Sequence, residues 1–148
     1  SLFNSVALRA WIHRSKLVTL GRALIALLFV PAGISKIFGF AGTVGYITSV
    51  GLPLPVLAAI GAIVIEVGAG LALLFGYRTQ LVALILAAFT LVAAVVFHNF
   101  WAAPAEMAQM QQIMFFKNVA VAGGLLILSA FSSAKNNWLG LNADDTVL

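Results

Sequence analysis

The sequence predicts an all-α protein, an integral membrane four-helix antiparallel bundle. Two properties of the whole chain lead to this prediction. Of its 148 residues, 63% are hydrophobic and only 8% are charged, and the mean hydropathy is +1.11. A soluble domain of this size needs many more charged residues to cover its surface. The long uncharged runs leave room for about four spans of roughly 20 residues each.

The net charge and the absence of cysteine narrow the function classes. The net charge is +4, but the basic residues gather at the ends of apolar segments, as in membrane proteins, so we expect no nucleic acid partner. The chain has no cysteine, which excludes disulfides, thiolate metal sites and iron–sulfur ligation by its own residues. The N-terminus shows no short apolar core followed by small residues, so we expect no signal peptide.

Residues 1–16 are predicted to form a basic amphipathic segment on the cytoplasmic membrane surface. Apolar residues at helical spacing make up one face: Leu8, Trp11 and Ile12. Basic residues make up another: Arg9, His13 and Lys16. This pattern is typical of a helix that lies in the membrane interface. The alternative is a basic tail that only determines topology.

Four apolar stretches predict the membrane spans, at about 17–39, 56–75, 80–97 and 111–131. Pro31 lies inside the first span, where a membrane helix tolerates it as a kink. Residues 39–53 hold several glycines, yet their apolar residues recur at helical spacing. We therefore expect a short interfacial or partly re-entrant helix there. Pro53 and Pro55 end it, because a residue before proline avoids the helical region.

The later connections are short, and the basic residues indicate the orientation. Residues 76–79 form a tight turn, Pro104 and Glu106 open the last helix, and residues 132–148 are expected to be a polar cytoplasmic tail. One side of the bundle collects most of the basic residues: Arg9, Arg14, Lys16, Arg22, Arg78 and Lys135. Lys36 and Lys117 lie toward the other side. By the positive-inside rule, both termini are then cytoplasmic.

Glu66 is the only charged residue of the apolar stretch 58–76 and lies near its middle. A carboxylate at this depth costs about 2.5–3.5 kcal/mol on insertion scales. We therefore expect that another group pairs with Glu66 or that the protein uses it.

The polar residues of the spans are predicted to share one pocket. Alanine or glycine lies about one helical turn from each of them: Lys36, Glu66, His98 and Lys117. Small residues mark the faces where membrane helices approach each other, so these side chains should point into the bundle. We expect a pocket that opens toward the outer face, with Glu66 at its floor. Its apolar walls are predicted to be small residues, Ala32, Gly33, Ala62, Gly70 and Ala120.

Each polar residue also has a simpler interpretation. Lys36 and Lys117 would then extend to the outer interface, and His98 with Asn99 would form an ordinary interfacial pair. Glu66 would form a structural salt bridge without chemistry. These alternatives stay open at the level of sequence.

We expect neither haem nor a metal site in this chain. Three methionines share a helical face, Met107, Met110 and Met114. Such a stripe indicates packing rather than copper or haem ligation, because methionine adapts well to irregular gaps. The two histidines, His13 and His98, fall on opposite sides of the membrane in the predicted topology, which argues against a bis-histidine haem.

The order of these signals resembles the DoxX family of small four-helix bacterial inner-membrane proteins. The resemblance covers about residues 17–129. The segments that carry it are Gly21-Arg22, Gly33-Ile34-Ser35-Lys36, Gly51-Leu52-Pro53-Leu54-Pro55, Glu66-Val67-Gly68-Ala69-Gly70, Gly76-Tyr77-Arg78, His98 and Lys117-Asn118. Membership implies a multi-pass protein of the bacterial cytoplasmic membrane that is linked to redox chemistry. Family members are associated with quinone-dependent oxidation, including thiosulfate:quinone oxidoreductase, and with oxidative-stress complexes.

Our first functional hypothesis is a quinone-dependent oxidoreductase, or a subunit of one. Glu66 and His98 are the candidate catalytic residues, as a proton relay. Lys36, Lys117 and Asn118 are the candidate cofactor-binding residues, with quinone as the cofactor. The chain has no evident electron carrier, so its expected partners, besides the lipid bilayer, include another membrane or redox subunit.

Two other hypotheses remain. The first is a non-catalytic accessory or assembly subunit of a larger membrane complex, with a structural Glu/Lys network. The second is a small transporter or anion-binding protein that uses Lys36 and Lys117.

Overall fold

Helices make up most of residues 2–132, the part of the chain that the computed structural model describes. Within this part there is no strand. Four helical stretches there are long and apolar enough to cross a membrane: Leu2–Phe38, Pro55–Phe75, Thr79–Ala102 and Ala105–Ala130. The predicted all-α membrane bundle is therefore confirmed. The predicted tail after Ser132, with Lys135, lies outside the described residues.

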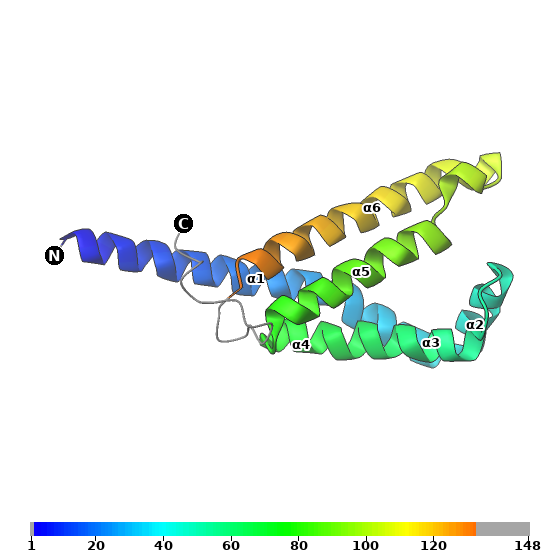
Figure 1. Cartoon of the computed structure of the whole chain (residues 1–148), viewed down its shortest axis with the longest axis horizontal. Coiled ribbons are helices and arrows are strands. Elements are labelled where there is room, and N and C mark those ends of the chain that lie inside the picture. The colour runs from blue at the N-terminus through cyan, green and yellow to red at the C-terminus, as the bar shows by residue number, and fades with distance from the viewer. Residues whose placement is uncertain (1, 133–148) are drawn as a thin grey trace.

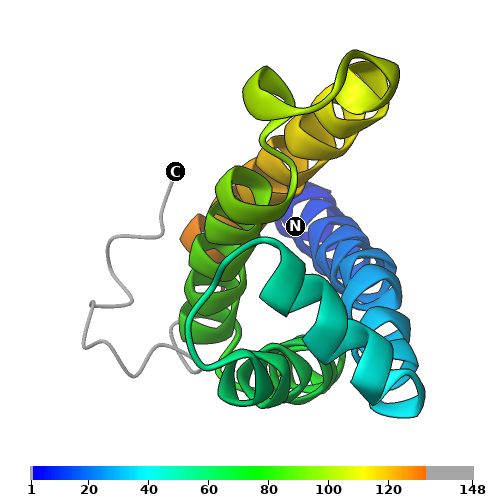
Figure 2. The same ribbon diagram turned by 90° about the vertical axis from the view of Figure 1, so that its right-hand side faces the viewer.

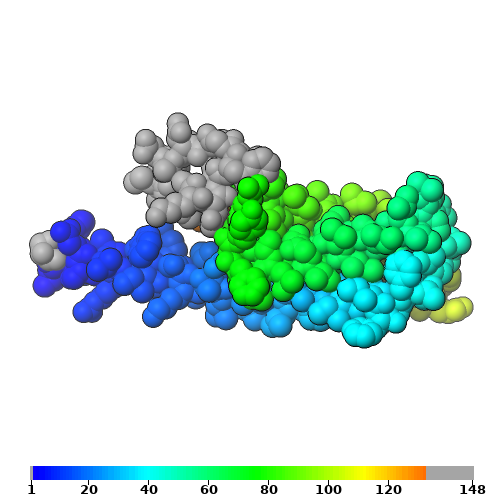
Figure 3. All heavy atoms as spheres, turned by 90° about the horizontal axis from the view of Figure 1, so that it is seen from below, coloured from blue at the N-terminus to red at the C-terminus, as the bar shows by residue number. Residues whose placement is uncertain are grey.

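The first helix, α1, runs without a break from Leu2 to Phe38. The predicted surface segment and the first span are thus one helix, and α1 also accommodates Pro31. Figures 1 and 3 show that its N-terminal part extends well beyond the other helices. With 37 residues, α1 is about 55 Å long, which exceeds a hydrocarbon core of about 30 Å. Part of α1 must therefore lie outside that core.

The connection between the first two spans is helical, as the sequence predicted. Helix α2 (Phe40–Ser49) begins directly after Gly39, and the chain then turns at Gly51, whose φ of +83° lies in the left-handed region. Helix α3 (Pro55–Ile63) starts at a proline, a residue suited to the first helical position because it needs no amide partner there. Figure 2 shows α2 lying across this end of the bundle, between α1 and α5.

The second span consists of three consecutive helical segments. After α3 comes a π-helical turn, η1 (Val64–Ala69), and then α4 (Gly70–Phe75). The sequence predicted a span at about 56–75 and gave no sign of a change in helix type within it. A π-helical turn contains i→i+5 hydrogen bonds and often occurs at functional sites. Glu66 lies inside η1.

The last two spans form a long antiparallel pair. Helix α5 (Thr79–Phe97) leads through the short 3₁₀ segment η2 (Phe100–Ala102) into α6 (Ala105–Ala130). α6 begins directly after Pro104, where the sequence predicted the start of the last helix. Ser129 near the end of α6 donates a hydrogen bond to the carbonyl of Gln80 on α5, at 3.0 Å.

The bundle has two helix pairs, one in which α1 packs along α3, η1 and α4, and one of α5 and α6. They come together at the α4–α5 turn and diverge toward α2 (Figure 1). We call these the closed end and the open end. At the closed end, a core of apolar side chains fills the space between the pairs: Phe29, Leu73, Val82, Ala83, Leu86, Ala87, Ala122, Leu125 and Leu128.

At the closed end, Arg22 of α1 forms a hydrogen bond with the end of α4. Its Nη1 donates to the carbonyl of Leu73 at 3.5 Å, which brings a positive charge to the C-terminus of α4, where the helix dipole favours it. Gly76 makes room for this contact, because a Cβ there would lie 2.0 Å from Nη1 of Arg22. Its φ of +72° lies in the left-handed region, which favours glycine.

Candidate functional site

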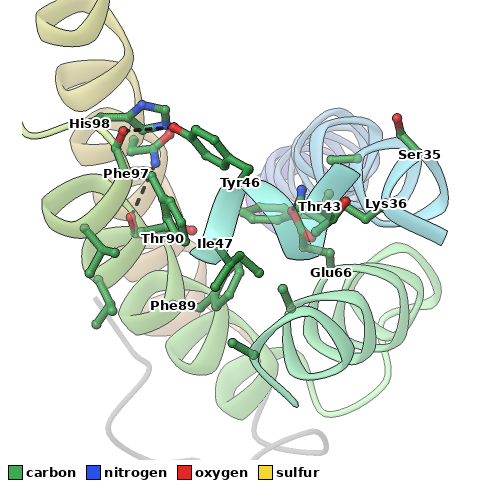
Figure 4. A pocket seen from close by; sticks show the side chains of 18 of the residues that line it. Ser35, Lys36, Thr43, Tyr46, Ile47, Glu66, Phe89, Thr90, Phe97 and His98 are labelled. Atoms are coloured by element: carbon green, nitrogen blue, oxygen red, sulfur yellow. Dashed lines mark hydrogen bonds and ion pairs between the residues drawn. The ribbon is translucent and has the colours of Figure 1, made fainter. Parts of the chain in front are cut away.

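A cavity of about 830 Å³ lies between the two helix pairs at the open end. Its volume falls within the range of about 300–1,000 Å³ that is usual for ligand pockets. Residues from α1, α2, α3, η1, α5 and α6 line it, and most of them are apolar. Figure 4 shows Glu66 and Lys36 on one wall, His98 and Thr90 on another, and Phe89 with Ile47 between them.

The wall made by α1 and η1 carries an ion pair. Nζ of Lys36 donates to Oε1 of Glu66 at 3.0 Å. Glu66 is 6% exposed, whereas the side chain of Lys36 is 34% exposed. The second carboxylate oxygen of Glu66, Oε2, is buried and has no hydrogen-bond partner. Glu66 thus belongs to an ion pair that satisfies only one of its oxygens.

The π-helical turn determines which residues share the cavity wall with Glu66. Because this turn holds more residues than an α-helical turn, the residues after it are rotated relative to those before it. Ala62 and Ala58, which precede Glu66 by one and two turns, line the cavity. Gly70, which follows it by one turn, instead packs against α1, where a Cβ would lie 2.8 Å from Cγ2 of Val30.

The wall made by α5 and α6 carries two hydrogen-bonded polar side chains, those of His98 and Asn118. Nδ1 of His98, directly after α5, lies 2.8 Å from Oε1 of Gln111 on α6, so the ring donates there when Nδ1 is protonated. Asn118 is buried, and its Nδ2 donates to the carbonyl of Thr90 at 3.5 Å. Both interactions connect the two helices and hold His98 and Asn118 on the cavity wall.

Tyr46 connects α2 to the second helix pair. Its ring stacks on Phe97 with centroids 5.6 Å apart, and its hydroxyl donates to the carbonyl of Phe97 at 3.4 Å. Ile47 beside it is buried and also lines the cavity. α2 therefore forms one side of the cavity, which Figure 4 shows.

All five residues that the sequence singled out line this cavity: Lys36, Glu66, His98, Lys117 and Asn118. The structure brings Lys36 to Glu66 and leaves Lys117 on the other wall. Lys117 is exposed, and its Nζ lies 3.9 Å from Sδ of Met114. Of the two lysines that line the cavity, Lys36 is the one in contact with Glu66.

The predicted lining of small residues is correct only in part. Ala32 and Ala62 line the cavity, but Gly33, Gly70 and Ala120 do not. Gly33 lies in the α1–η1 contact, where a Cβ would be 2.6 Å from Cγ2 of Val67, and Ala120 is exposed. Glycine at a close helix crossing excludes a cavity at the same place, because the two backbones touch there.

Several polar residues of the site were missed at the level of sequence, among them Gln111 and Tyr46. Gln111 lies seven residues before Asn118, so a search for polar residues two turns from Asn118 on the same helical face would have found it. Tyr46 lies in the predicted interfacial helix. An apolar ring with a polar hydroxyl is typical of membrane interfaces, and this could have marked Tyr46 as a residue of interest.

The model of the DoxX family matches residues 17–99, which is more than half of the chain. The chain belongs to the DoxX family. This confirms the resemblance that the sequence motifs indicated. The match includes the cavity residues Lys36, Glu66 and His98 and ends before Lys117 and Asn118.

Two relatives from Escherichia coli strain K12 extend the comparison. The inner membrane protein YphA is 38% identical over 116 residues, which cover 78% of this chain and 83% of the relative. The inner membrane protein YqjF is 40% identical over 112 residues, which cover 76% of this chain and 81% of the relative. Both names state a location and no activity. No solved structure matches the chain.

Proposed function

We propose that this DoxX-family membrane protein is a quinone-binding redox subunit of the bacterial cytoplasmic membrane. The single observation that carries the proposal is the cavity of about 830 Å³ at the open end. It combines an apolar lining with polar groups on two walls, an arrangement that suits a ligand with an apolar body and a few polar atoms.

The lining fits the parts of a quinone. Three aromatic side chains, Phe29, Phe89 and Phe97, supply apolar surface for a ring and its tail. Lys36 and Asn118 carry hydrogen-bond donors for the ring oxygens, and Lys117 adds a positive charge to the lining. A bound quinone would supply the two-electron chemistry that the side chains of the chain do not offer.

Glu66 and His98 are proposed to exchange protons at this site. A carboxylate and an imidazole are common acid–base groups, and each must lie within hydrogen-bond reach of the atom that it serves. Both line the cavity, on opposite walls. With Nδ1 of His98 bonded to Gln111, Nε2 is the ring nitrogen that remains for a ligand.

The electrons are proposed to come from another protein. None of the polar residues of the cavity is a redox carrier, so an electron donor, either a second membrane subunit or a soluble protein, must reach the site. This makes a stable or transient redox partner part of the proposal.

The proposed orientation has both termini in the cytoplasm and the open end toward the periplasm. It is supported by charge, because Arg22 and Arg78 lie at the closed end and Lys36 and Lys117 at the open end. A reporter fused after Arg78 should read cytoplasmic, and one fused near Ala102 should read periplasmic. A periplasmic signal at Arg78 would reverse the orientation.

A second candidate function is a non-catalytic accessory subunit. The contact between Lys36 and Glu66 at 3.0 Å favours it, because a structural ion pair needs no ligand to hold it in place. Under this reading, the apolar outer surface would dock on a larger membrane complex.

Mass spectrometry of the gently purified protein tests the two candidates against each other. The redox proposal predicts a quinone in the lipid extract in a fixed ratio to the protein, and the loss of that quinone in a Glu66→Gln variant. A stoichiometric large partner with no quinone, in wild type and variant alike, would overturn the redox proposal in favour of the accessory subunit.

A further inference from the structure

A second hollow, with a volume of about 460 Å³, lies between α1 and α6 at the closed end. We call it the α1–α6 groove. The two helices run antiparallel here, and α1 continues beyond the end of α6 (Figure 1). The groove shares no lining residue with the cavity at the open end. It is therefore a separate site, which the proposed function does not use.

The lining of the groove is apolar except for one residue, Arg14 of α1. Gly21 and Ile25 continue the face of α1 on which Arg14 lies, and Gly124 belongs to the α6 side. A Cβ at Gly21 or at Gly124 would have no atom within 4 Å. Arg14 is exposed, so a ligand can reach its guanidinium. The groove thus offers open apolar space with a positive charge beside it.

The groove has the length and the depth of one leaflet of a bilayer. From Leu17 to Ile37, α1 rises about 30 Å, which is the thickness of a hydrocarbon core. Arg14 then lies about one turn outside this core, at the level of the lipid headgroups. The face from Arg14 to Ile25 extends about 16 Å along α1, roughly half of that thickness. A lipid molecule would fit with its headgroup at Arg14 and an acyl chain along the groove.

The charges at the closed end favour an anionic headgroup. Arg9 and Lys16 lie within about two turns of each other on α1, with Arg14 between them. Within residues 2–132 the only acidic residues are Glu66 and Glu106, and both lie toward the open end. In this part of the chain, no carboxylate balances the charge beside the groove. Basic pockets between membrane helices are known to bind anionic lipid headgroups.

We propose that the α1–α6 groove binds one anionic phospholipid, with its phosphate at Arg14 and one acyl chain over Gly21 and Gly124. Apolar surface without neighbouring atoms loses its dispersion contacts, so an acyl chain stabilises the groove by filling it. A zwitterionic lipid fits the apolar part equally well, but it carries an ammonium that Arg14 repels. Arg14 therefore provides the preference for an anionic lipid, and the two glycines provide the room for its chain.

Native mass spectrometry of the full-length protein in detergent tests the inference. The probes are phosphatidylglycerol and phosphatidylethanolamine with identical acyl chains, added together in equal amounts. We expect one lipid to be retained, with a preference for phosphatidylglycerol of about fivefold, the effect of one basic residue near an anionic lipid. Equal retention of the two lipids would overturn the inference. Retention of neither lipid, or a dimer without lipid, would overturn it as well.

Two arginine variants test the role of the charge. Arg14→Gln should bring the retention ratio of the two lipids close to one. Arg9→Gln is the matched control, because it removes a positive charge from α1 outside the lining of the groove, and it should leave the ratio unchanged. Equal effects of the two variants would show that the net charge of α1, and not the groove, selects the lipid.

Two glycine variants test the place of the acyl chain. Gly124→Leu should fill the groove and abolish the retention of phosphatidylglycerol. Gly123→Leu is the matched control, since Gly123 does not line the groove and a Cβ there also has no atom within 4 Å. This control should retain the lipid as the wild type does. Full retention by Gly124→Leu would contradict the proposed position of the chain.

Discussion

The closed end and the open end are built from the same long helices but differ in what lies between them. At the closed end, leucine side chains are fully buried, Leu73, Leu86 and Leu125 among them, and Arg22 fastens α1 to the end of α4. At the open end, the helix pairs diverge and enclose a cavity with an ion pair and a π-helical turn. The closed end thus contains most of the tightly packed core. The open end contains a cavity, a buried charge and an irregular helical turn, which cost stability and are typical of functional sites.

The largest expected effect is on the free energy of unfolding, when the same substitution, leucine to alanine, is made at each end. Leu86→Ala should lower the free energy of unfolding by about 2–5 kcal/mol, because it opens a void in a filled core. Leu28→Ala removes the same atoms from a partly exposed residue of the cavity lining and should cost less than about 1 kcal/mol. Thermal unfolding in detergent measures both. Equal losses would show that the two ends do not differ in packing.

The ion pair of the open end should give the next largest effect. Glu66→Gln keeps the shape of the side chain and leaves the ammonium of Lys36 without its carboxylate. Since Lys36 is partly exposed, we expect a loss of about 1–3 kcal/mol, below the value for a fully buried pair. Adding Lys36→Met should restore part of this loss. Strictly additive effects in the double variant would mean that the two side chains do not interact.

A smaller effect on stability is expected from the contact between Arg22 and Leu73 at the closed end. Arg22→Met removes the positive charge at the C-terminus of α4 and should destabilise the protein by about 0.3–1 kcal/mol. Arg9→Met, a matched change in the exposed N-terminal part of α1, should leave the thermal midpoint unchanged. If both variants behave alike, the contact between Arg22 and Leu73 does not stabilise the bundle.

The sequence predicted the helices, their connections and the charged residues better than the packing between the helices, for a physical reason. Apolar runs and turn residues identify helices and short connections, so the spans and the turn at Gly76 could be predicted. Glu66 and Lys36 were identified because charges are costly in apolar segments. These signals are local and do not depend on how the helices pack.

The details of the cavity depend on packing and could not be predicted in the same way. Alanine and glycine near the polar residues were expected to line it, but Gly33 and Gly70 mark the places where α1 touches η1 and α4. Small residues mark places where helices touch, so a cavity is expected where the helices stand apart. Larger residues such as Phe89 line the space there. The π-helical turn around Glu66 gave no sequence signal that we recognise.

The central claim is that the open end holds a quinone, and a thermal-shift titration tests it most directly. A short-tailed quinone analogue at about 100 times its dissociation constant should stabilise the wild type by about 2.7 kcal/mol. Lys36→Met and Glu66→Gln should each weaken this protection, because both residues line the cavity. Arg78→Gln, at the closed end, should retain it in full. A wild-type melting curve that no quinone analogue shifts would contradict the claim.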